Sequence, residues 1–350
     1  MSAVPVDKNA SRETINLFGN LENLAQEKLM YGQHHCYLLG DHVDGSGDTS
    51  DCQYVTGSHP AVAGFDFVRD TAWAPDDSSK PFYVQCVALY NRGGIPTFSW
   101  HQTNPGGGGA YDLEKDPVPE ILDNGSRINQ RFKDDLREIA GFFNSLKVDG
   151  VNIPVIYRPY HENSGSWFWW GADFCTPDEY RQLWQLTYHF LTDICDVHNL
   201  LWAYSPSKPD SVGNYNDRYP GDDYVDILGF DWYGRAGEDE AWPENVRNTA
   251  RIVCELAEEK GKVAAYTEAG ERKGFRNTDL SNWFSLMWLD NFKNDPIAKK
   301  LSYVLTWNSP AWSCFQTGTN AHCYDDFMKF YRDEFTVFEE DLPSMYDTPK

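Results

Sequence analysis

The sequence predicts an α/β protein whose 350 residues form a single-domain (β/α)8 barrel of the TIM type. Three observations predict this fold. Eight short apolar runs alternate with stretches of helical periodicity, the runs are apolar on both faces as in covered parallel strands, and no linker or repeat divides the chain. Barrels of this length are common as one unit, so residues 1–350 are expected to be one domain, with residues 1–13 as a flexible N-terminal segment.

The eight apolar runs are the expected strands. Periodicity alone does not show that a sheet closes, so a doubly wound open sheet is the alternative. In a barrel, the chemistry lies at the C-terminal ends of the strands. The expected strands are Met30–Gln33, Ala63–Phe67, Ile95–Trp100, Ile153–Arg158, Leu200–Tyr204, Val225–Phe230, Val263–Thr267 and Leu301–Trp307.

Helical patterns fill the intervals between these strands. One apolar stripe with 3–4 spacing predicts a helix from about Ser126 to Leu146. A second helix is predicted from its start, because Thr176 can cap it, Pro177 suits the first helical position and Glu179 completes a capping box. Further stripes run up to Gly261 and through the segment that holds Phe284, Met287 and Leu289.

The charge balance restricts the class of partner. The chain has 53 acidic and 30 basic residues, a net charge of −23 at pH 7. A field of this sign repels nucleic acid and anionic membranes, so neither is an expected partner and a neutral ligand fits better. No run approaches the roughly 20 apolar residues of a membrane span. Aromatic residues make up 15% of the chain, and sugars stack on such rings.

The eight cysteines form no C-x-x-C pair, which argues against a structural zinc site. Their even number favours an oxidising compartment and at least one disulfide, with Cys314–Cys323 as the first candidate, while buried free thiols are the alternative. The N-terminus lacks the apolar segment of a signal peptide. A secreted protein is expected, from which the signal has been removed.

The densest polar and aromatic cluster of the chain follows the fourth expected strand. It places the guanidinium of Arg158, the imidazole of His161 and the carboxylate of Glu162 directly before four large rings at 167–170. A single glutamate would more simply be a surface residue paired with Arg158. A cluster of this composition is difficult to bury without leaving polar groups unpaired, so it favours a functional site.

A second carboxylate, Glu268, follows the seventh expected strand. The fourth and seventh strands of a barrel lie across its mouth, so Glu162 and Glu268 can face each other over a cleft. Hydrolysis of a glycosidic bond needs this arrangement, because one carboxyl protonates the leaving oxygen while the other attacks or activates water. Alone, Glu268 would be interpreted as a carboxylate at a helix start; the pair predicts a glycoside hydrolase.

Other chemistries fail on specific positions. His161-Glu162 begins like the zinc motif H-E-x-x-H, but Gly165 stands where the second histidine would be. The Gly106–Gly109 run lacks the Lys-Ser/Thr of a phosphate-binding loop, and we interpret it as a mobile loop. No G-x-S-x-G motif occurs. We therefore expect no metal and no cofactor.

Several motifs together resemble glycoside hydrolase family 26, the β-mannanase family of a large clan of retaining (β/α)8 hydrolases. The resemblance covers about 32–307. The histidine before Glu162 is specific, because most of that clan carries asparagine there. The motifs are RPYHE at 158–162, GSWFWWG at 165–171, FSWH at 98–101, YPGDDYVDILGFDWY at 219–233, TE at 267–268 and YVLTW at 303–307.

The resemblance implies Glu162 as the acid/base and Glu268 as the nucleophile, with Tyr233 hydrogen-bonded to the nucleophile. The other residues that it implies hold the charged centre, line the sugar site or shape outer subsites. Arg158 and His161 have the first role, His101, Asp231, Trp167 and Trp307 the second, and His34, His35, Trp312 and the Gly106–Gly109 loop the third.

The implied protein is a secreted, monomeric endo-β-1,4-mannanase that acts on β-mannan, glucomannan and galactomannan by retaining double displacement, its carboxyls about 5 to 5.5 Å apart. The Asp41–Ser58 and Thr103–Asp112 loops are rich in glycine and small polar residues. We expect them to border the cleft without blocking it, which favours endo attack. The alternatives are a mannobiose-releasing exo enzyme, a relative active on β-glucan or xylan, and a polysaccharide-binding protein without catalysis.

Overall fold

A computed structural model describes residues 4–68, 72–234, 240–272, 274–275, 280–307 and 323–349. Its main sheet is parallel, in the order β10-β9-β8-β7-β6-β3-β2-β1, and pairing of β1 with β10 closes it. Closure confirms the barrel and excludes the open sheet. The barrel strands are β1 (Leu29–His34), β2 (Val62–Asp66), β3 (Ile95–Ser99), β6 (Val155–Arg158), β7 (Leu200–Tyr204), β8 (Ile227–Gly234), β9 (Val263–Glu271) and β10 (Tyr303–Thr306).

The eight expected strands all occur in the expected order. β8 and β9 continue past their predicted ends to Gly234 and Glu271. Three short strands were not predicted: β11 (Thr336–Val337) pairs with the start of β1, and β4 (Lys147–Val148) and β5 (Val151–Asn152) form a hairpin.

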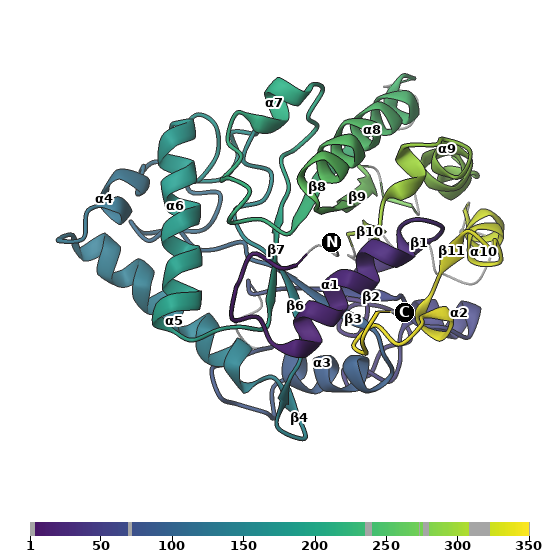
Figure 1. Cartoon of the computed structure of the whole chain (residues 1–350), viewed down its shortest axis with the longest axis horizontal. Coiled ribbons are helices and arrows are strands. Elements are labelled where there is room, and N and C mark those ends of the chain that lie inside the picture. The colour runs from purple at the N-terminus through teal and green to yellow at the C-terminus, as the bar shows by residue number, and fades with distance from the viewer. Residues whose placement is uncertain are drawn as a thin grey trace.

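Helices surround the barrel in Figure 1. The predicted capping box is present, because Thr176 accepts from the backbone of Glu179 and the Glu179 carboxylate accepts from the backbone of Thr176. The α-helices are α1 (Arg12–Leu24), α2 (Asp51–Thr56), α3 (Pro81–Asn91), α4 (Val118–Leu122), α5 (Arg127–Ser145), α6 (Pro177–His189), α7 (Val212–Asn216), α8 (Trp242–Lys260), α9 (Asp290–Lys293) and α10 (Tyr324–Tyr331). The π-helical turns are η1 (Phe190–Ile194) and η2 (Ser285–Leu289), and the 3-10 turns are η3 (Ala298–Lys300) and η4 (Glu339–Asp341).

Alternating strand residues build two apolar cores, one between the barrel and its helices and one inside the barrel. Leu17, Phe18 and Leu21 of α1 belong to the inner core, together with early strand residues such as Val62 and Val263. Figure 1 shows α1 lying across the ring of strands. The helix therefore closes the N-terminal end of the barrel and leaves the C-terminal end for a site.

The N-terminal segment differs from expectation. The backbone N–H of Val6 donates to the Asp226 carboxylate at 2.8 Å, and buried Asp7 contacts His198 at 2.8 Å. Ser11 caps α1, which begins at Arg12. Residues 4–13 are thus held by defined contacts and helix formation, where a flexible segment was expected for 1–13.

The described part contains seven cysteines, all of which are free thiols. The predicted Cys314–Cys323 disulfide involves a position outside the described residues, so the pair stays a prediction. Within the same described ranges, no helix combines the length and apolar character needed to span a membrane.

Candidate active site

A cavity of about 370 Å³ lies at the C-terminal ends of the barrel strands. It combines two carboxylates, two cations, imidazoles and aromatic rings. Its lining residues are His101, Tyr111, His161, Glu162, Trp167, Phe168, Ser207, Lys208, Tyr233, Glu268, Arg272 and Trp307. Both predicted catalytic carboxylates therefore face one space, although no contact between them defines their separation and the predicted 5 to 5.5 Å stays a prediction.

Glu162 lies in a tight loop directly after β6. Tyr160 and Glu162 have left-handed backbone conformations, with φ of 48° and 55°. Such conformations are uncommon for residues with side chains and persist where the surroundings hold them. Here the Glu162 N–H donates to the carbonyl of Ser205 at 2.8 Å, and the Trp170 indole donates to the carbonyl of His161 at 2.8 Å. These contacts fix the direction of the Glu162 side chain.

The Glu162 carboxyl is suited to carry a proton near neutral pH. Burial raises its pKa to about 7, and the negative charge of Glu268 adds to this rise. The Trp167 indole N–H donates to Glu162 Oε2 at 2.7 Å and acts in the opposite direction, because it stabilises the carboxylate. A pKa near the working pH is what a general acid/base requires.

Glu268 reaches the cavity because β9 contains a bulge. Asp231 pairs with Glu268 while the preceding residue, Phe230, pairs with Tyr266, so Thr267 is an extra residue in β9. Regular alternation would direct Thr267 inward and Glu268 outward. With the bulge, Thr267 bonds Asp231 inside the barrel and Glu268 also points inward.

Two donors hold the Glu268 carboxylate in place. The Arg158 guanidinium donates to Oε2 at 2.5 Å, and the Tyr233 hydroxyl donates to Oε1 at 2.7 Å. Arg158 also donates to Asp231 at 2.5 Å, and both of these residues are buried. These two charged and polar donors fix the orientation of the Glu268 carboxyl group in the cavity.

Imidazoles form the wall next to this pair. The ring centroids of His101 and His161 lie 4.7 Å apart. His101 also contacts Asp66 at the end of β2, and this contact raises the pKa of His101 against the opposing effect of burial. Burial, with Arg158 adding to it, lowers the pKa of His161 well below its ordinary value.

Aromatic side chains provide the apolar part of the cavity. Trp167 is 39% exposed and Tyr111 is 63% exposed, so a ligand can reach both rings. Trp307 and Phe168 line the same space. Trp167 and Trp307 were predicted at the sugar site. Tyr111 was not singled out, although it lies in the Thr103–Asp112 loop, and Phe168 was noted only as part of its motif.

Several predicted site residues lie elsewhere. Asp231 was expected on the cavity wall, but it is fully buried beneath that wall. His34 and His35 were expected at outer subsites, but they are 1% and 2% exposed, and the His34 ring packs 4.6 Å from that of Trp307. These three residues support the wall from behind.

The two other features expected at the outer subsites are the Gly106–Gly109 loop and Trp312. The Gly106–Gly109 run does not line the cavity and is joined by hydrogen bonds, among them Gly106 N–H to the Asn104 side chain and Lys115 Nζ to the Gly106 carbonyl. Its interpretation as a mobile loop has no support in these contacts. Trp312 lies outside the described residues.

Three further residues of the lining were not predicted. Ser207 and Lys208 follow β7, and Arg272 follows β9. Their position after strand ends was the available signal. Among the described residues, no group of three or more His, Cys, Asp and Glu side chains is arranged to hold a metal ion.

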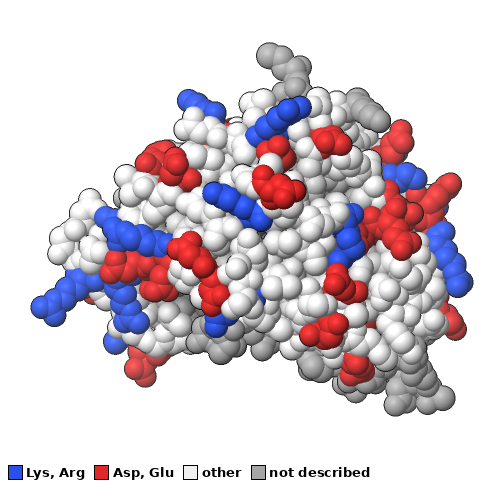
Figure 2. All heavy atoms as spheres, turned by 90° about the horizontal axis from the view of Figure 1, so that it is seen from below, with Lys and Arg blue, Asp and Glu red and all other residues white. Residues whose placement is uncertain are grey.

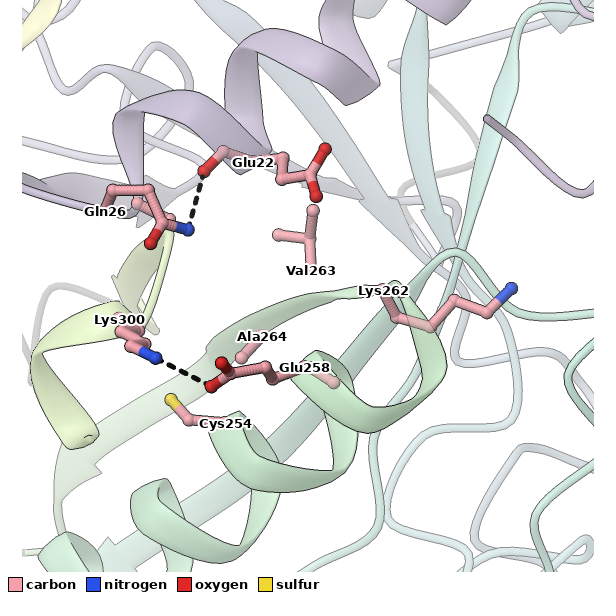
Figure 3. Close-up of a pocket in the computed structure, with 11 residues that line it drawn as sticks. Glu22, Gln26, Cys254, Glu258, Lys262, Val263, Ala264 and Lys300 are labelled. Carbon is pink, nitrogen blue, oxygen red and sulfur yellow. Dashed lines mark hydrogen bonds and ion pairs between the residues drawn. The ribbon is translucent and has the colours of Figure 1, made fainter. Parts of the chain in front are cut away.

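A second hollow, of about 240 Å³, lies at the opposite end of the barrel between the ends of α1 and α8 (Figure 3). Glu258 faces Lys300 there at 2.7 Å, and Val263 at the start of β9 forms part of the wall. Both catalytic candidates are absent from its lining.

On the face shown in Figure 2, acidic and basic side chains are interspersed.

Comparisons with known proteins agree with this geometry. The family model described as glycosyl hydrolase family 26 matches residues 6–317. A mannan endo-1,4-β-mannosidase of Bifidobacterium adolescentis is 34% identical over 323 residues, 86% of this chain but 31% of that protein. Another, of Bacillus subtilis, is 28% identical over 338 residues, 92% of this chain and 87% of that protein.

A solved structure extends the likeness to the fold. A double mutant of the Cellulomonas fimi endo-β-1,4-mannanase superposes with a TM-score of 0.90 at 31% identity, covering 99% of this chain and 80% of that chain. The family match spans most of the sequence and includes every residue of the candidate site. This chain therefore belongs to glycosyl hydrolase family 26, as its motifs indicated.

Proposed function

We propose that this protein is an endo-β-1,4-mannanase that hydrolyses β-mannan, glucomannan and galactomannan with retention of the anomeric configuration. One observation carries the proposal. Glu162, whose pKa is about 7, shares a cavity with Glu268, whose carboxyl group is oriented by Arg158 and Tyr233. The mannanase names of the two relatives and of the solved structure support mannan as the substrate class.

The proposed reaction has two steps. In the first, a Glu268 oxygen attacks the anomeric carbon, the glycosidic bond breaks, and Glu162 gives its proton to the departing oxygen. In the second, Glu162 takes a proton from water, the water oxygen bonds to the anomeric carbon, and the bond to Glu268 breaks. Each carboxyl ends in the state in which it began.

The walls suit a neutral sugar. Trp167 and Trp307 offer ring faces, while His101 and His161 offer nitrogen atoms that can bond hydroxyl groups. The Arg158 guanidinium forms ion pairs with both Asp231 and Glu268, so Asp231 helps to hold Arg158 in place. We also propose that the protein is secreted and monomeric; both remain predictions.

Leaving-group dependence tests the two roles. Glu162→Ala is expected to lose far more rate on mannan than on an activated aryl mannoside, because an acidic phenol leaves with little protonation. Glu268→Ala is expected to abolish both activities. Equal losses on both substrates in both variants would contradict the assignment, and absence of turnover in the unchanged protein would favour a binding protein.

Product analysis tests the substrate and the mode of attack. Proton NMR of early products is expected to show the β-anomer, and activity on mannan should exceed that on β-glucan and xylan. Endo attack should lower the viscosity of a galactomannan solution steeply while few reducing ends have formed. Mannobiose as the sole early product would contradict endo attack and indicate that a loop blocks one end of the cleft.

A further inference from the structure

Asp66 is the last residue of β2, and its buried carboxylate lies behind the catalytic cavity. It receives four donors: the Ser99 hydroxyl at 2.8 Å, the backbone N–H of Val68 at 3.0 Å, the backbone N–H of His101 at 3.1 Å, and His101 Nδ1. A carboxylate has about four acceptor positions. Asp66 is thus fully occupied as an anion inside the protein.

This contact determines the protonation of His101. An ionised carboxylate only accepts, so His101 Nδ1 carries a hydrogen that points at Asp66. Nε2, on the other side of the ring, remains for the cavity that His101 lines. The charge of Asp66 stabilises a second proton on the ring and raises its pKa, although burial acts against this.

Neighbouring imidazoles provide an internal comparison. His34 and His161 are also buried near the cavity, and no carboxylate forms a hydrogen bond with either ring in the described part of the chain. For both residues burial lowers the pKa, and Arg158 lowers it further. Asp66 therefore distinguishes one imidazole of this cluster from the others.

We propose that Asp66 is a positioning residue that keeps His101 as an imidazolium with Nε2 directed into the cavity, where it donates to a hydroxyl of the sugar beside the scissile bond. This inference rests on the proposed function for the identity of the sugar. Charged donors form stronger hydrogen bonds than neutral ones, so the contact should strengthen sugar binding.

Other charges around the ring set the pH range. Glu268 on β9 favours the imidazolium, and Arg158 on β6 opposes it. Glu162, His34 and the phenol of Tyr111 are further titratable groups nearby, and His161 is in ring contact. The proton is expected to remain on His101 above the ordinary histidine pKa of 6.5, and affinity for the sugar should fall when the pH rises far enough to remove it.

The test uses Glu162→Gln as the parent protein, because this change stops turnover and removes the titration of the acid/base. Nitrogen-15 NMR of the imidazoles should show His101 protonated on both nitrogens at neutral pH, with the signal identified by its loss in His101→Gln. Adding Asp66→Asn should lower this pKa. Asp135→Asn is the matched control, since Asp135 contacts Gln102 next to His101 and not the ring itself.

Calorimetry with manno-oligosaccharides gives the second measurement. Asp66→Asn in the parent should weaken binding about tenfold, the difference between a charged and a neutral hydrogen bond. In a parent that also carries His101→Gln, Asp66→Asn should have no further effect. A purely structural role would give the same loss in both backgrounds and would overturn the proposal.

The outcomes separate this inference from the proposed function. If the parent fails to bind manno-oligosaccharides, the proposed function is wrong, while the His101 titration still tests the role of Asp66. If the parent binds them and Asp66→Asn changes neither affinity nor the His101 signal, the inference is wrong. If Asp66→Asn does not fold, the nitrogen-15 NMR of the Glu162→Gln parent alone tests the proposal. A neutral His101 ring at neutral pH in that protein would overturn it.

Discussion

Replacing Glu268 by glutamine removes a negative charge beside Glu162 and is expected to lower the pKa of Glu162. Two unit charges about 5 to 5.5 Å apart repel by about 3 kcal/mol at an effective dielectric constant near 20, which corresponds to about 2 pKa units. Burial is the larger cause of the observed rise to about 7. The variant should therefore retain a raised pKa, lower than that of the wild type by about 1 to 2 units.

Carbon-13 NMR of the glutamate carboxyls measures this change. The Glu162 resonance is assigned by its loss in Glu162→Gln, and its midpoint is compared between the wild type and Glu268→Gln. Glu258→Gln is the control, because Glu258 lies at the hollow at the other end of the barrel. A Glu162 midpoint that is the same in Glu268→Gln and the wild type would refute the electrostatic coupling.

The same coupling suits the two roles that we propose for Glu162. Formation of the proposed glycosyl-enzyme neutralises Glu268 as the substitution does, so the Glu162 pKa should fall in the intermediate. A carboxyl that has just given up its proton is then more stable as the base that the second step needs. In the free enzyme the pKa of Glu162 remains at about 7. The value of kcat/KM on mannan should therefore fall as the pH rises above about 7, where Glu162 loses the proton that the first step needs.

Three further substitutions test other contacts. Tyr233→Phe removes the hydroxyl that donates to Glu268, the proposed nucleophile, and should lower kcat about tenfold or more with a smaller change in KM; an unchanged kcat would contradict the proposed role. Arg158→Met leaves two buried carboxylates without their shared cation and should lower the free energy of unfolding by about 3 to 5 kcal/mol in urea titrations; a loss below about 1 kcal/mol would contradict the buried pairing. Gly64→Ala places a Cβ 2.5 Å from the His34 ring and should cost about 1 to 3 kcal/mol in the same assay, and full stability would show that His34 can move.

The sequence was sufficient to locate the strands and the two carboxylates that share the cavity. β7 occurs at its predicted bounds, because apolar residues on both faces and polar residues at the strand end are local signals. Glu162 and Glu268 could be predicted because barrel topology brings the ends of distant strands together. The roles expected for their neighbours came from the family resemblance and stay predictions.

Other features depend on contacts between distant segments and have no local signal. The inward direction of Glu268 needs the bulge at Thr267, which is defined only against the register of β8 and β10. The role of α1 as the lower closure of the barrel depends on where its apolar face packs. Asp66 lies near the end of an expected strand, but its partner His101 follows the next strand, β3, so the pair emerges only from the structure.

The charges of the site explain why the pKa of Glu162 is raised. In the described residues at the site, Asp66, Glu162, Asp231 and Glu268 supply four carboxyls, and Arg158 forms ion pairs with two of them, Asp231 and Glu268. Asp66 contacts His101 instead. Full ionisation would thus leave Glu162 as a buried anion without an ion pair beside other negative charges, which is unfavourable. Burial and Glu268 accordingly raise its pKa to about 7. The acid proposed for the first step therefore depends on Arg158 pairing with Asp231 and Glu268 and not with Glu162.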